Sequence, residues 1–174
     1  MILAWHLGKR TGIDTDLFIS KLAKATAEKP FQISTDGWAP YSAAIEKHLV
    51  PRGVDFSQVV KSYGKVEDGR EARYSPSEVT NITKTPMLGL PDMSRSCTSH
   101  IERQNGTLRQ WCKRFTRLTY AFSKKWPNMS AALALHFAHY NFCRVHGALK
   151  VTPAMEAGIT NRVWSLAELI QAGA

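Results

Sequence analysis

The segment from Ser96 to Lys125 constrains the fold more than any other stretch, because its residues repeat at helical spacing over nearly its whole length. Arg109, Lys113 and Arg117 step by four along one side. The apolar residues recur at steps of three, four and seven, which places them together on another side; they are Ile101, Leu108, Cys112, Phe115, Leu118 and Phe122. The pattern predicts one long helix that can pack an apolar stripe on a sheet and keep a cationic stripe in water.

Glu102 is a lone acid in the first turn of this predicted helix, with Asn105 and Arg109 following at i+3 and i+7 on its own face. Ser99 and Glu102 have the spacing of a capping box, and a first-turn carboxylate also suits the helix dipole. A carboxylate beside cations can instead hold a metal ion against a phosphate backbone. Spacing alone favours the cap and leaves the metal ligand open.

Asp36 is the second candidate acid. The residues from Phe31 to Thr35 alternate apolar and polar, which predicts a strand, and Asp36-Gly37 follows directly. A strand that ends in Asp-Gly places a carboxylate at the carboxyl edge of a sheet, where open α/β sheets bind ligands. The same dipeptide is also an ordinary turn signal, so the pattern by itself allows both interpretations.

The rest of the chain is predicted from periodicity and from Gly and Pro punctuation. In the first part of the chain we expect a buried strand over 1–7, helices over 14–27 (with Asp14 or Thr15 as N-cap) and 41–49, and a strand over 54–63. In the last part we expect a turn at 126–128, a helix over 129–146, a capped helical turn over 152–157 and an amphipathic tail over 164–172. The polar stretch 64–96 is predicted to be a long loop. The cations in this stretch, which include Lys65, Arg70, Arg73, Lys84 and Arg95, together with Lys61 just before it, suit either a DNA-contact insertion or a solvated loop.

The net charge narrows the class of partner. The 174 residues carry +9, with a sequence pI near 9.7, and nucleic acid is the commonest partner for such an excess. Charge alone does not exclude a ribosomal-type or membrane-surface protein. The sequence has neither a run of apolar residues long enough to cross a bilayer nor a signal-peptide pattern. Cys97, Cys112 and Cys143 form no disulfide framework, so we expect a cytoplasmic protein.

His139, Cys143 and His146 lie at i, i+4 and i+7, which is also metal-ligand spacing. Three ligands from a single helix do not close a tetrahedral site, and no second ligand cluster accompanies them. We therefore expect packing for Cys143 and hydrogen bonding for the histidines.

Several motifs, taken together and in order, resemble those of bacterial DDE transposases of the insertion-sequence-one type. They are Trp-His-Leu-Gly-Lys-Arg at 5–10, Ser-Thr-Asp-Gly at 34–37, Gly-Arg-Glu-Ala-Arg-Tyr-Ser-Pro at 69–76, Ile-Glu-Arg-Gln-Asn at 101–105, Arg-Phe-Thr-Arg-Leu-Thr at 114–119, Ala-Phe-Ser-Lys-Lys at 121–125, His-Tyr-Asn-Phe-Cys-Arg-Val-His at 139–146 and Val-Thr-Pro-Ala-Met-Glu-Ala-Gly at 151–158. The resemblance spans nearly the whole chain. One departure is Trp38, which stands where many relatives have His.

The resemblance implies an RNase H-like α/β core, with an incomplete mixed sheet flanked by helices. It implies one domain over 1–174, with the loop at 64–96 and a helical part over 97–174. The family's first catalytic Asp and its strand would precede Met1, so the chain is expected to be N-terminally truncated; Asp14 and Asp16 do not replace that acid, because a helix begins there. Asp36 and Glu102 are implied as catalytic residues and as ligands of two Mg²⁺ (or Mn²⁺) ions, for DNA strand cleavage and strand transfer.

The implied partners are transposon ends and target DNA, bound by a homo-oligomer, with no membrane contact and a place near the bacterial nucleoid. The expected DNA contacts are Arg103, Asn105, Arg109, Lys113, Arg114, Arg117, Lys124, Lys125, Arg144 and His146. Trp111 and Tyr120 are expected in the core rather than stacked on bases. Because one acid is missing, we expect weak Mg²⁺ binding and no transposition. The alternatives are a non-catalytic basic DNA-binding module, in which Glu102 is only a cap, and a chain without a stable fold.

Overall fold

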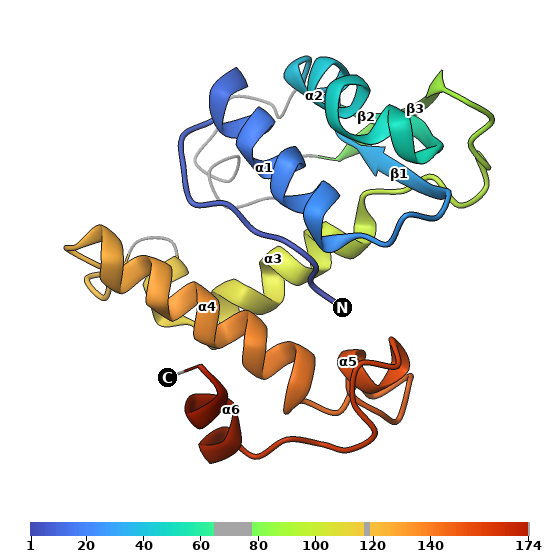
Figure 1. Ribbon diagram of the computed structural model, residues 1–174. Coiled ribbons are helices and arrows are strands. Elements are labelled where there is room, and N and C mark those ends of the chain that lie inside the picture. The colour runs from blue at the N-terminus through green and yellow to red at the C-terminus, as the bar shows by residue number, and fades with distance from the viewer. Residues whose placement is uncertain (65–77, 117–118, 174) are drawn as a thin grey trace. The chain divides into compact units, whose positions relative to one another are not determined.

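The computed structural model describes residues 1–64, 78–116 and 119–173, and these residues form a mixed α/β structure (Figure 1). They divide into two compact units, although the sequence predicts one domain. The first, here called the sheet unit, is Gly8–Glu102. The second, here called the helical unit, combines Met1–Leu7 with Arg103–Ala174. The boundary falls inside a helix, directly after Glu102, and each unit is described separately below.

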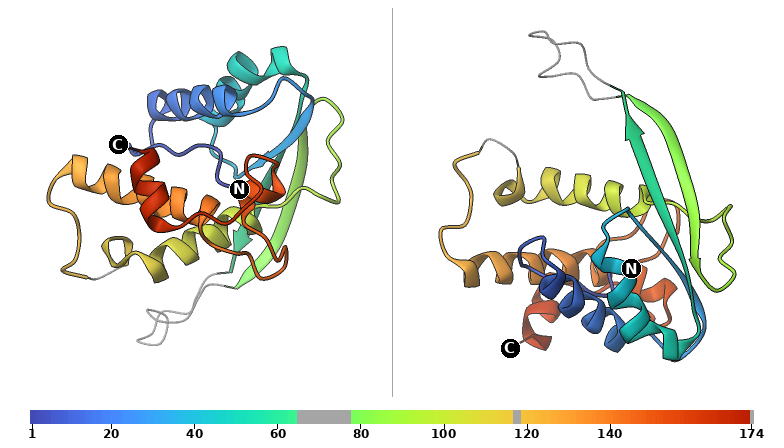
Figure 2. Two further views of the ribbon diagram at one scale, coloured as in Figure 1. Left: turned by 60° about the horizontal axis from the view of Figure 1, so that its bottom comes forward. Right: turned by 90° about the horizontal axis from the view of Figure 1, so that it is seen from above.

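The sheet unit holds a three-stranded sheet in the part of the chain that the structure describes. Its elements are α1 (Gly12–Ala25), β1 (Phe31–Thr35), α2 (Pro40–Leu49), the 3-10 turn η1 (Val50–Arg52), β2 (Val54–Tyr63), β3 (Val79–Leu88) and the first turn of α3 (Ser99–Trp111). The strand order is β1-β2-β3. β1 runs parallel to β2, and β3 returns antiparallel as the outer partner of β2 (Figure 2). The sheet is therefore mixed, as expected.

One face of the sheet carries the apolar core. Val54 and Phe56 of β2 alternate with polar neighbours and pack against α1 and α2, whose buried residues are Ile19, Ala23, Ala44, Ile45 and Leu49. Phe31 and Ile33, which pair with Val54 and Phe56, extend the same face. The opposite face is polar at its centre. Two helices thus cover one side of the sheet and leave the other side for the segment that leads into α3.

Local sequence signals explain most of these boundaries. Thr11 caps α1 by accepting a hydrogen bond from the Asp14 amide, and a proline occupies the first turn of α2. Gly53 has φ +69°, the left-handed conformation that glycine adopts without strain, and it ends η1 so that β2 can begin. The predicted strands at 31–35 and 54–63 and the helix at 41–49 are confirmed.

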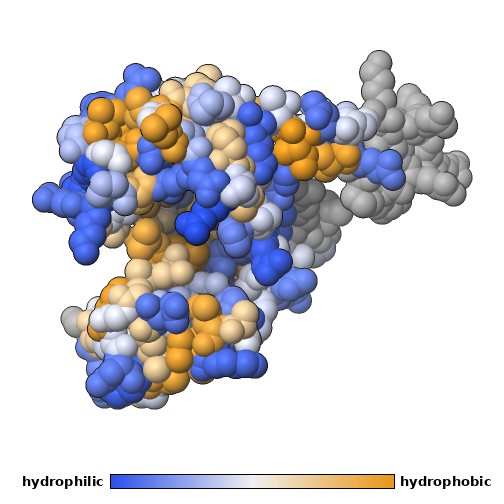
Figure 3. Space-filling view, turned by 90° about the vertical axis from the view of Figure 1, so that its right-hand side faces the viewer, coloured by the Kyte–Doolittle hydropathy of each residue, from blue (hydrophilic) through white to orange (hydrophobic). Residues whose placement is uncertain are grey.

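Two predictions for the sheet unit need correction. The first helix begins at Gly12 with Thr11 as its cap, instead of with Asp14 or Thr15. The predicted loop over 64–96 contains β3, which is exposed along almost its whole length. Residues 65–77 of that loop, with Lys65, Arg70 and Arg73, lie outside the described residues. On the surface, apolar side chains gather in small groups between hydrophilic ones (Figure 3).

The helical unit contains the remainder of α3, the 3-10 turn η3 (Lys113–Phe115), α4 (Trp126–Phe142), α5 (Pro153–Glu156) and α6 (Leu166–Ala172). The single long helix predicted for the Ser96–Lys125 segment is wrong. α3 ends at Trp111, because Cys112 has extended backbone angles, φ −116° and ψ 97°. The residues that follow are rich in aromatic and β-branched types, which lose side-chain freedom in a helix. Arg109 and Lys113 therefore do not share one helical stripe.

Three further predictions for the helical unit are corrected. Met1–Leu7 forms no strand; instead the Ile2 amide donates to Asn141 Oδ1 and Asn141 Nδ2 donates to the Ile2 carbonyl, both at 2.8 Å. A side-chain amide on α4 thus takes the place of a neighbouring strand. Trp126-Pro127 begins α4 instead of forming a turn, since proline suits the first turn of a helix. α4 ends at Phe142, so His146 lies beyond the helix.

The C-terminal helices follow the predicted signals. Thr152 caps α5 through the Met155 amide, as expected for the capped turn at 152–157. Ser165 and Glu168 form a reciprocal capping box at the start of α6. Among the helices of the described residues, none has the length and apolar character needed to cross a membrane.

Candidate active site

Asp36 lies at the carboxyl end of β1, one residue after the strand ends. Its Oδ1 accepts a hydrogen bond from the Trp38 amide at 3.1 Å, and its Oδ2 lies 3.4 Å from the Arg10 guanidinium. The Arg10 guanidinium also stacks 4.5 Å from the centre of the Trp38 ring, and the Trp38 indole donates to Thr15 at 3.0 Å. Trp38, at the position where the resemblance leads us to expect His, thus holds a cation against the acid.

The surroundings of Asp36 show its charge acting on a neighbour. The Tyr41 pKa is raised, first by burial of its ring and then by the Asp36 carboxylate, while Arg10 acts in the opposite direction. Asp36 itself is exposed, with 57% of its side chain open to solvent. The carboxylate is accessible to a ligand and has one basic partner that a ligand can displace.

Glu102 lies in the first turn of α3, and two side chains donate hydrogen bonds to its carboxylate. Lys61 Nζ on β2 donates to both carboxylate oxygens at 2.6 Å, and Thr98 Oγ1 donates to Oε1 at 2.7 Å. The Lys61 ammonium, and then the Thr98 hydroxyl, hold the Glu102 pKa below its ordinary value. Ser99 and Glu102 do not form the expected capping box. The Ser99 hydroxyl donates to Cys97 Sγ instead, and the Glu102 carboxylate accepts from Thr98, the residue before α3.

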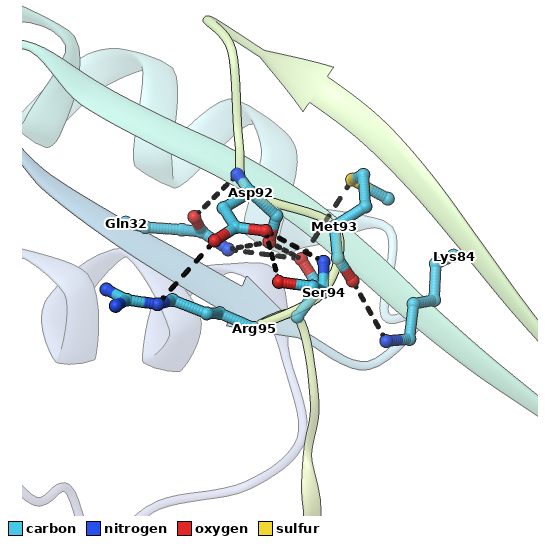
Figure 4. Close-up of polar contacts among 7 residues, drawn as sticks. Gln32, Lys84, Asp92, Met93, Ser94 and Arg95 are labelled. Carbon is cyan, nitrogen blue, oxygen red and sulfur yellow. Dashed lines mark hydrogen bonds and ion pairs between the residues drawn. The ribbon is translucent and has the colours of Figure 1, made fainter.

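The start of α3 is fixed by polar contacts to the sheet. Ser57 of β2 shares hydrogen bonds with Ser34 of β1 at 2.9 Å and with Ser96 at 2.8 Å. The Gln32 amide donates to the Asp92 carbonyl and accepts from the Asp92 amide (Figure 4). These contacts hold the loop before α3 on the polar face of the sheet.

The same loop is tightened from within and from β3. Asp92 accepts from both the amide and the hydroxyl of Ser94, and Lys84 of β3 donates to the Met93 carbonyl at 2.9 Å (Figure 4). Because the loop is bonded to all three strands of the described sheet, the start of α3 is fixed, and the position of Glu102 is fixed with it.

Both acids lie toward the same end of the sheet. The β1–β2 register pairs Thr35 with Gln58, so Asp36 comes level with the residue after Gln58. A Cβ built on Gly37 would lie 2.9 Å from a methyl group of Val60, which confirms that the Asp-Gly turn presses against β2 at this point. Lys61, which carries Glu102, is then about 7 Å farther along β2. Asp36 and the Lys61–Glu102 pair therefore lie toward the same end of the sheet.

The metal site that the resemblance implies is only partly matched. Carboxylate oxygens are the donors that Mg²⁺ and Mn²⁺ prefer. Among the residues that the structure describes, however, no group of three or more Asp, Glu, His or Cys residues could hold a metal ion. Asp36 and Glu102 have the right donor chemistry for one divalent cation, and they are too few for two.

Asp14 and Asp16 have other contacts. Asp14 accepts from the Thr11 hydroxyl at 2.6 Å, within the cap of α1. Asp16 accepts from Lys47 and lies 2.8 Å from the His48 ring, and these two partners hold its pKa below the ordinary value. Asp14 therefore belongs to the cap of α1, and Asp16 links α1 to α2.

Most of the predicted DNA contacts belong to the helical unit and are exposed. Those with exposed side chains are Arg103, Asn105, Arg109, Lys113, Arg114, Lys124 and Lys125. Arg144 is half-buried over the Trp111 ring at 4.2 Å, and His146 is also half-buried. Arg117 lies outside the described residues. Trp111 and Tyr120, expected in the core, are 60% and 102% exposed, so that prediction is wrong.

The charge is divided unequally between the two units. The helical unit has ten Lys and Arg against two Asp and Glu, a net of +8, whereas the sheet unit has thirteen against twelve, a net of +1. The cations that sequence reasoning missed as site residues are Arg10 and Lys61, which pair with the two acids. A signal existed for Lys61, since it follows the buried Val59 at a spacing of two and so shares its face of β2.

Comparisons with protein-family models, with curated proteins and with solved structures each found no match to this chain.

Proposed function

We propose that this chain is the catalytic core of a DNA transposase of the DDE type, with an RNase H-like fold, that acts on phosphodiesters of DNA. One observation carries the proposal. Asp36 and Glu102, which are 66 positions apart, lie in one compact unit toward the same end of its sheet. The sequence motifs imply these same two residues as catalytic acids, on grounds that do not involve the structure.

The charge distribution supports DNA as the substrate. Eight of the nine net positive charges belong to the helical unit, which contains all ten predicted DNA contacts. Contacts of this kind neutralise phosphates and release counterions, so they give affinity without sequence preference. The acids and the cationic surface then have separate tasks, one in chemistry and the other in holding the backbone.

The two acids would do their work through hard oxygen donors. A divalent cation bound by Asp36 and Glu102 would stabilise the charge that develops on the leaving oxygen of a phosphodiester. Lys61 and Arg10 neutralise the two carboxylates in the absence of such a cation, and each must move aside for the oxygens to bind it. With only two carboxylates, each already paired, we expect weak Mg²⁺ binding and no transposition by this chain.

The test is whether divalent cations strengthen DNA binding through the two acids. Calcium, which supports binding without cleavage, is added to the chain and a fluorescent duplex. We expect the dissociation constant to fall in wild type and to stay unchanged in Asp36→Asn and Glu102→Gln. Glu46→Gln, an exposed carboxylate on α2, is the matched control and should respond like wild type. An equal response of all four proteins would rule out a metal site at these acids.

The second candidate function is that of a non-catalytic basic DNA-binding module. A specific contact favours it: both Glu102 oxygens are already used by Lys61, and one of them also by Thr98, as in a purely structural ion pair. This alternative predicts DNA binding that calcium does not change. Mg²⁺-dependent nicking of a terminal-repeat duplex, lost in Glu102→Ala, would exclude it and would also contradict the expected inactivity.

A further inference from the structure

Two cavities in the helical unit meet at the end of α3. One, of about 630 Å³, lies between Trp111 and the side chains of α4, including Ala131 and His139. The other, of about 680 Å³, lies between Trp111 and the segment that leads into α4. Trp111, Cys112, Arg114 and Asn128 line both, so the two spaces are contiguous at one tryptophan. Both are wide open to solvent, so each is a shallow hollow against which a flat group can lie.

The tryptophan at this junction is presented to solvent and held in place. Its side chain is 60% exposed, and the Arg144 guanidinium lies 4.2 Å from the ring centre. Arg144 lines neither cavity, so the cation and the cavities meet different parts of the indole. A cation–π contact orients the ring and leaves the rest of its surface for another flat group.

The chemistry of the two cavities differs. The first has apolar walls from Ala131 and its neighbours on α4, and its polar groups are Arg114, Asn128, His136 and His139. The second is lined by four cations, Lys113, Arg114, Lys124 and Lys125, and Arg114 is held by a hydrogen bond to Ser123 at 2.7 Å. A flat, partly polar ring suits the first cavity, and an anionic chain suits the second.

We propose that these two cavities bind an unpaired nucleotide of DNA, with its base against Trp111 in the first cavity and its backbone phosphates along the cations of the second. A base within a duplex is stacked and paired, and it cannot enter a cavity without leaving the helix. A base that is already unpaired enters at no such cost, and it stacks on an aromatic ring whatever its identity. This inference depends on the proposed function only in taking DNA as the partner.

The experiment compares two hairpin duplexes that each contain one 2-aminopurine. In one duplex this base is paired, and in the other it is an unpaired bulge. Stacking of one base on an aromatic ring contributes about 1–3 kcal/mol, so the bulged duplex should bind roughly tenfold tighter. The 2-aminopurine fluorescence should be quenched on binding. Trp111→Leu should abolish both effects, and Trp111→Phe should keep most of each.

The matched control is Trp126→Leu, which removes another tryptophan of 60% exposure that lines neither cavity. It should behave like wild type. Ala131→Phe, at an exposed position of α4, should obstruct the first cavity and reduce the preference while Trp111 itself is unchanged. This second variant decides the question if Trp111→Leu does not fold, which circular dichroism reports.

The outcomes separate the two proposals. Equal binding of the paired and bulged duplexes by wild type, absent quenching, or an equal loss in Trp126→Leu would overturn the nucleotide site and leave the transposase proposal standing. Binding of neither duplex would overturn both. A Trp111-dependent preference with no calcium response at Asp36 and Glu102 would support the nucleotide site in a non-catalytic DNA-binding protein.

Discussion

The sheet unit and the helical unit use their residues in opposite ways. The sheet unit buries a continuous apolar cluster, which includes Ile19, Ile45 and Phe56, and has a net charge of only +1. In the helical unit, Leu133, Pro153 and Ala154 are the buried apolar residues among those described, and the net charge is +8. Apolar burial therefore stabilises the sheet unit, whereas the most distinctive property of the helical unit is the positive charge on its surface.

The difference agrees with the division of tasks proposed above. Carboxylates that must meet at a fixed distance need a rigid scaffold, and the parallel strands with their buried core supply it. Cations that follow a phosphate backbone need exposure more than rigidity, and like charges close together lower the stability of the unit that carries them. The helical unit is therefore expected to gain order when DNA neutralises its charge.

The largest expected effect comes from removing a core side chain of the sheet unit. Phe56 is 2% exposed and lies at the centre of the cluster, so Phe56→Ala should lower the free energy of unfolding by about 3–5 kcal/mol. Leu133→Ala, in the helical unit at 6% exposure, should cost about 2 kcal/mol, because few buried neighbours surround it. Urea unfolding measures both. Equal costs would mean that the helical unit has a core comparable to that of the sheet unit.

The sequence predicted the sheet unit better than the helical unit, because burial is greater in the sheet unit. In the sheet unit, Pro30, Gly53 and Asp36-Gly37 interrupt the chain where elements end, and buried residues alternate between them. The predicted bounds of β1, β2 and α2 therefore agree with the structure to within one residue. Asp36 could be placed at a strand end, since only the local pattern was needed.

The errors fall where burial does not enforce the pattern. β3 has no buried face and contains Pro86, which argues against a strand in sequence but is tolerated at an edge. In the helical unit, Phe115 and Phe122 continue the apolar spacing of α3 past Trp111, although the backbone turns at Cys112. Periodicity cannot detect such a turn, because the spacing of residues is the same whether or not the chain follows it.

The partners of the candidate acids were the other part that the sequence could not supply. Arg10 precedes α1, and Lys61 lies on β2, 41 positions before Glu102. Only the packed fold brings each cation to its acid. The division into two units, with its boundary inside α3, was equally invisible, because a helix shows no sequence signal at a boundary between units.

The next effect in size concerns the surface of the helical unit. We expect DNA binding to weaken with salt, and Lys124→Gln with Lys125→Gln should make the slope of log affinity against log salt shallower by about 2. The matched change in the sheet unit, Lys24→Gln with Lys29→Gln, should leave the slope as it is, because that unit is nearly neutral. Both lysines of each pair are exposed. Fluorescence anisotropy over a salt series gives the slopes, and an equal change for the two pairs would remove the distinction between the units.

The smallest expected effect concerns the Lys61–Glu102 ion pair and how much it contributes to the stability of the sheet unit. The Glu102 pKa is lowered by Lys61 first and by Thr98 second, so its carboxylate stabilises the folded state above the unfolded pKa near 4.5. That contribution is lost as the pH falls through the lowered folded value. Because 52% of the Glu102 side chain is exposed, the pair should contribute only about 0.2–1 kcal/mol.

Lys61→Met isolates this contribution, since it keeps most of the apolar side chain and removes the charge. The Glu102 pKa should rise toward its ordinary value, which NMR titration of the carboxyl carbon reports directly. The difference in unfolding free energy between Lys61→Met and wild type should be largest above about pH 5 and should shrink below pH 4. Lys84→Met, which removes a lysine bonded to the Met93 carbonyl instead of to an acid, controls for the loss of a charge on the neighbouring strand. If Lys61→Met also strengthens the calcium response of DNA binding, the ammonium competes with the cation for the Glu102 oxygens; if the response is unchanged, Glu102 is a structural partner of Lys61 and the sheet unit has a single candidate catalytic acid.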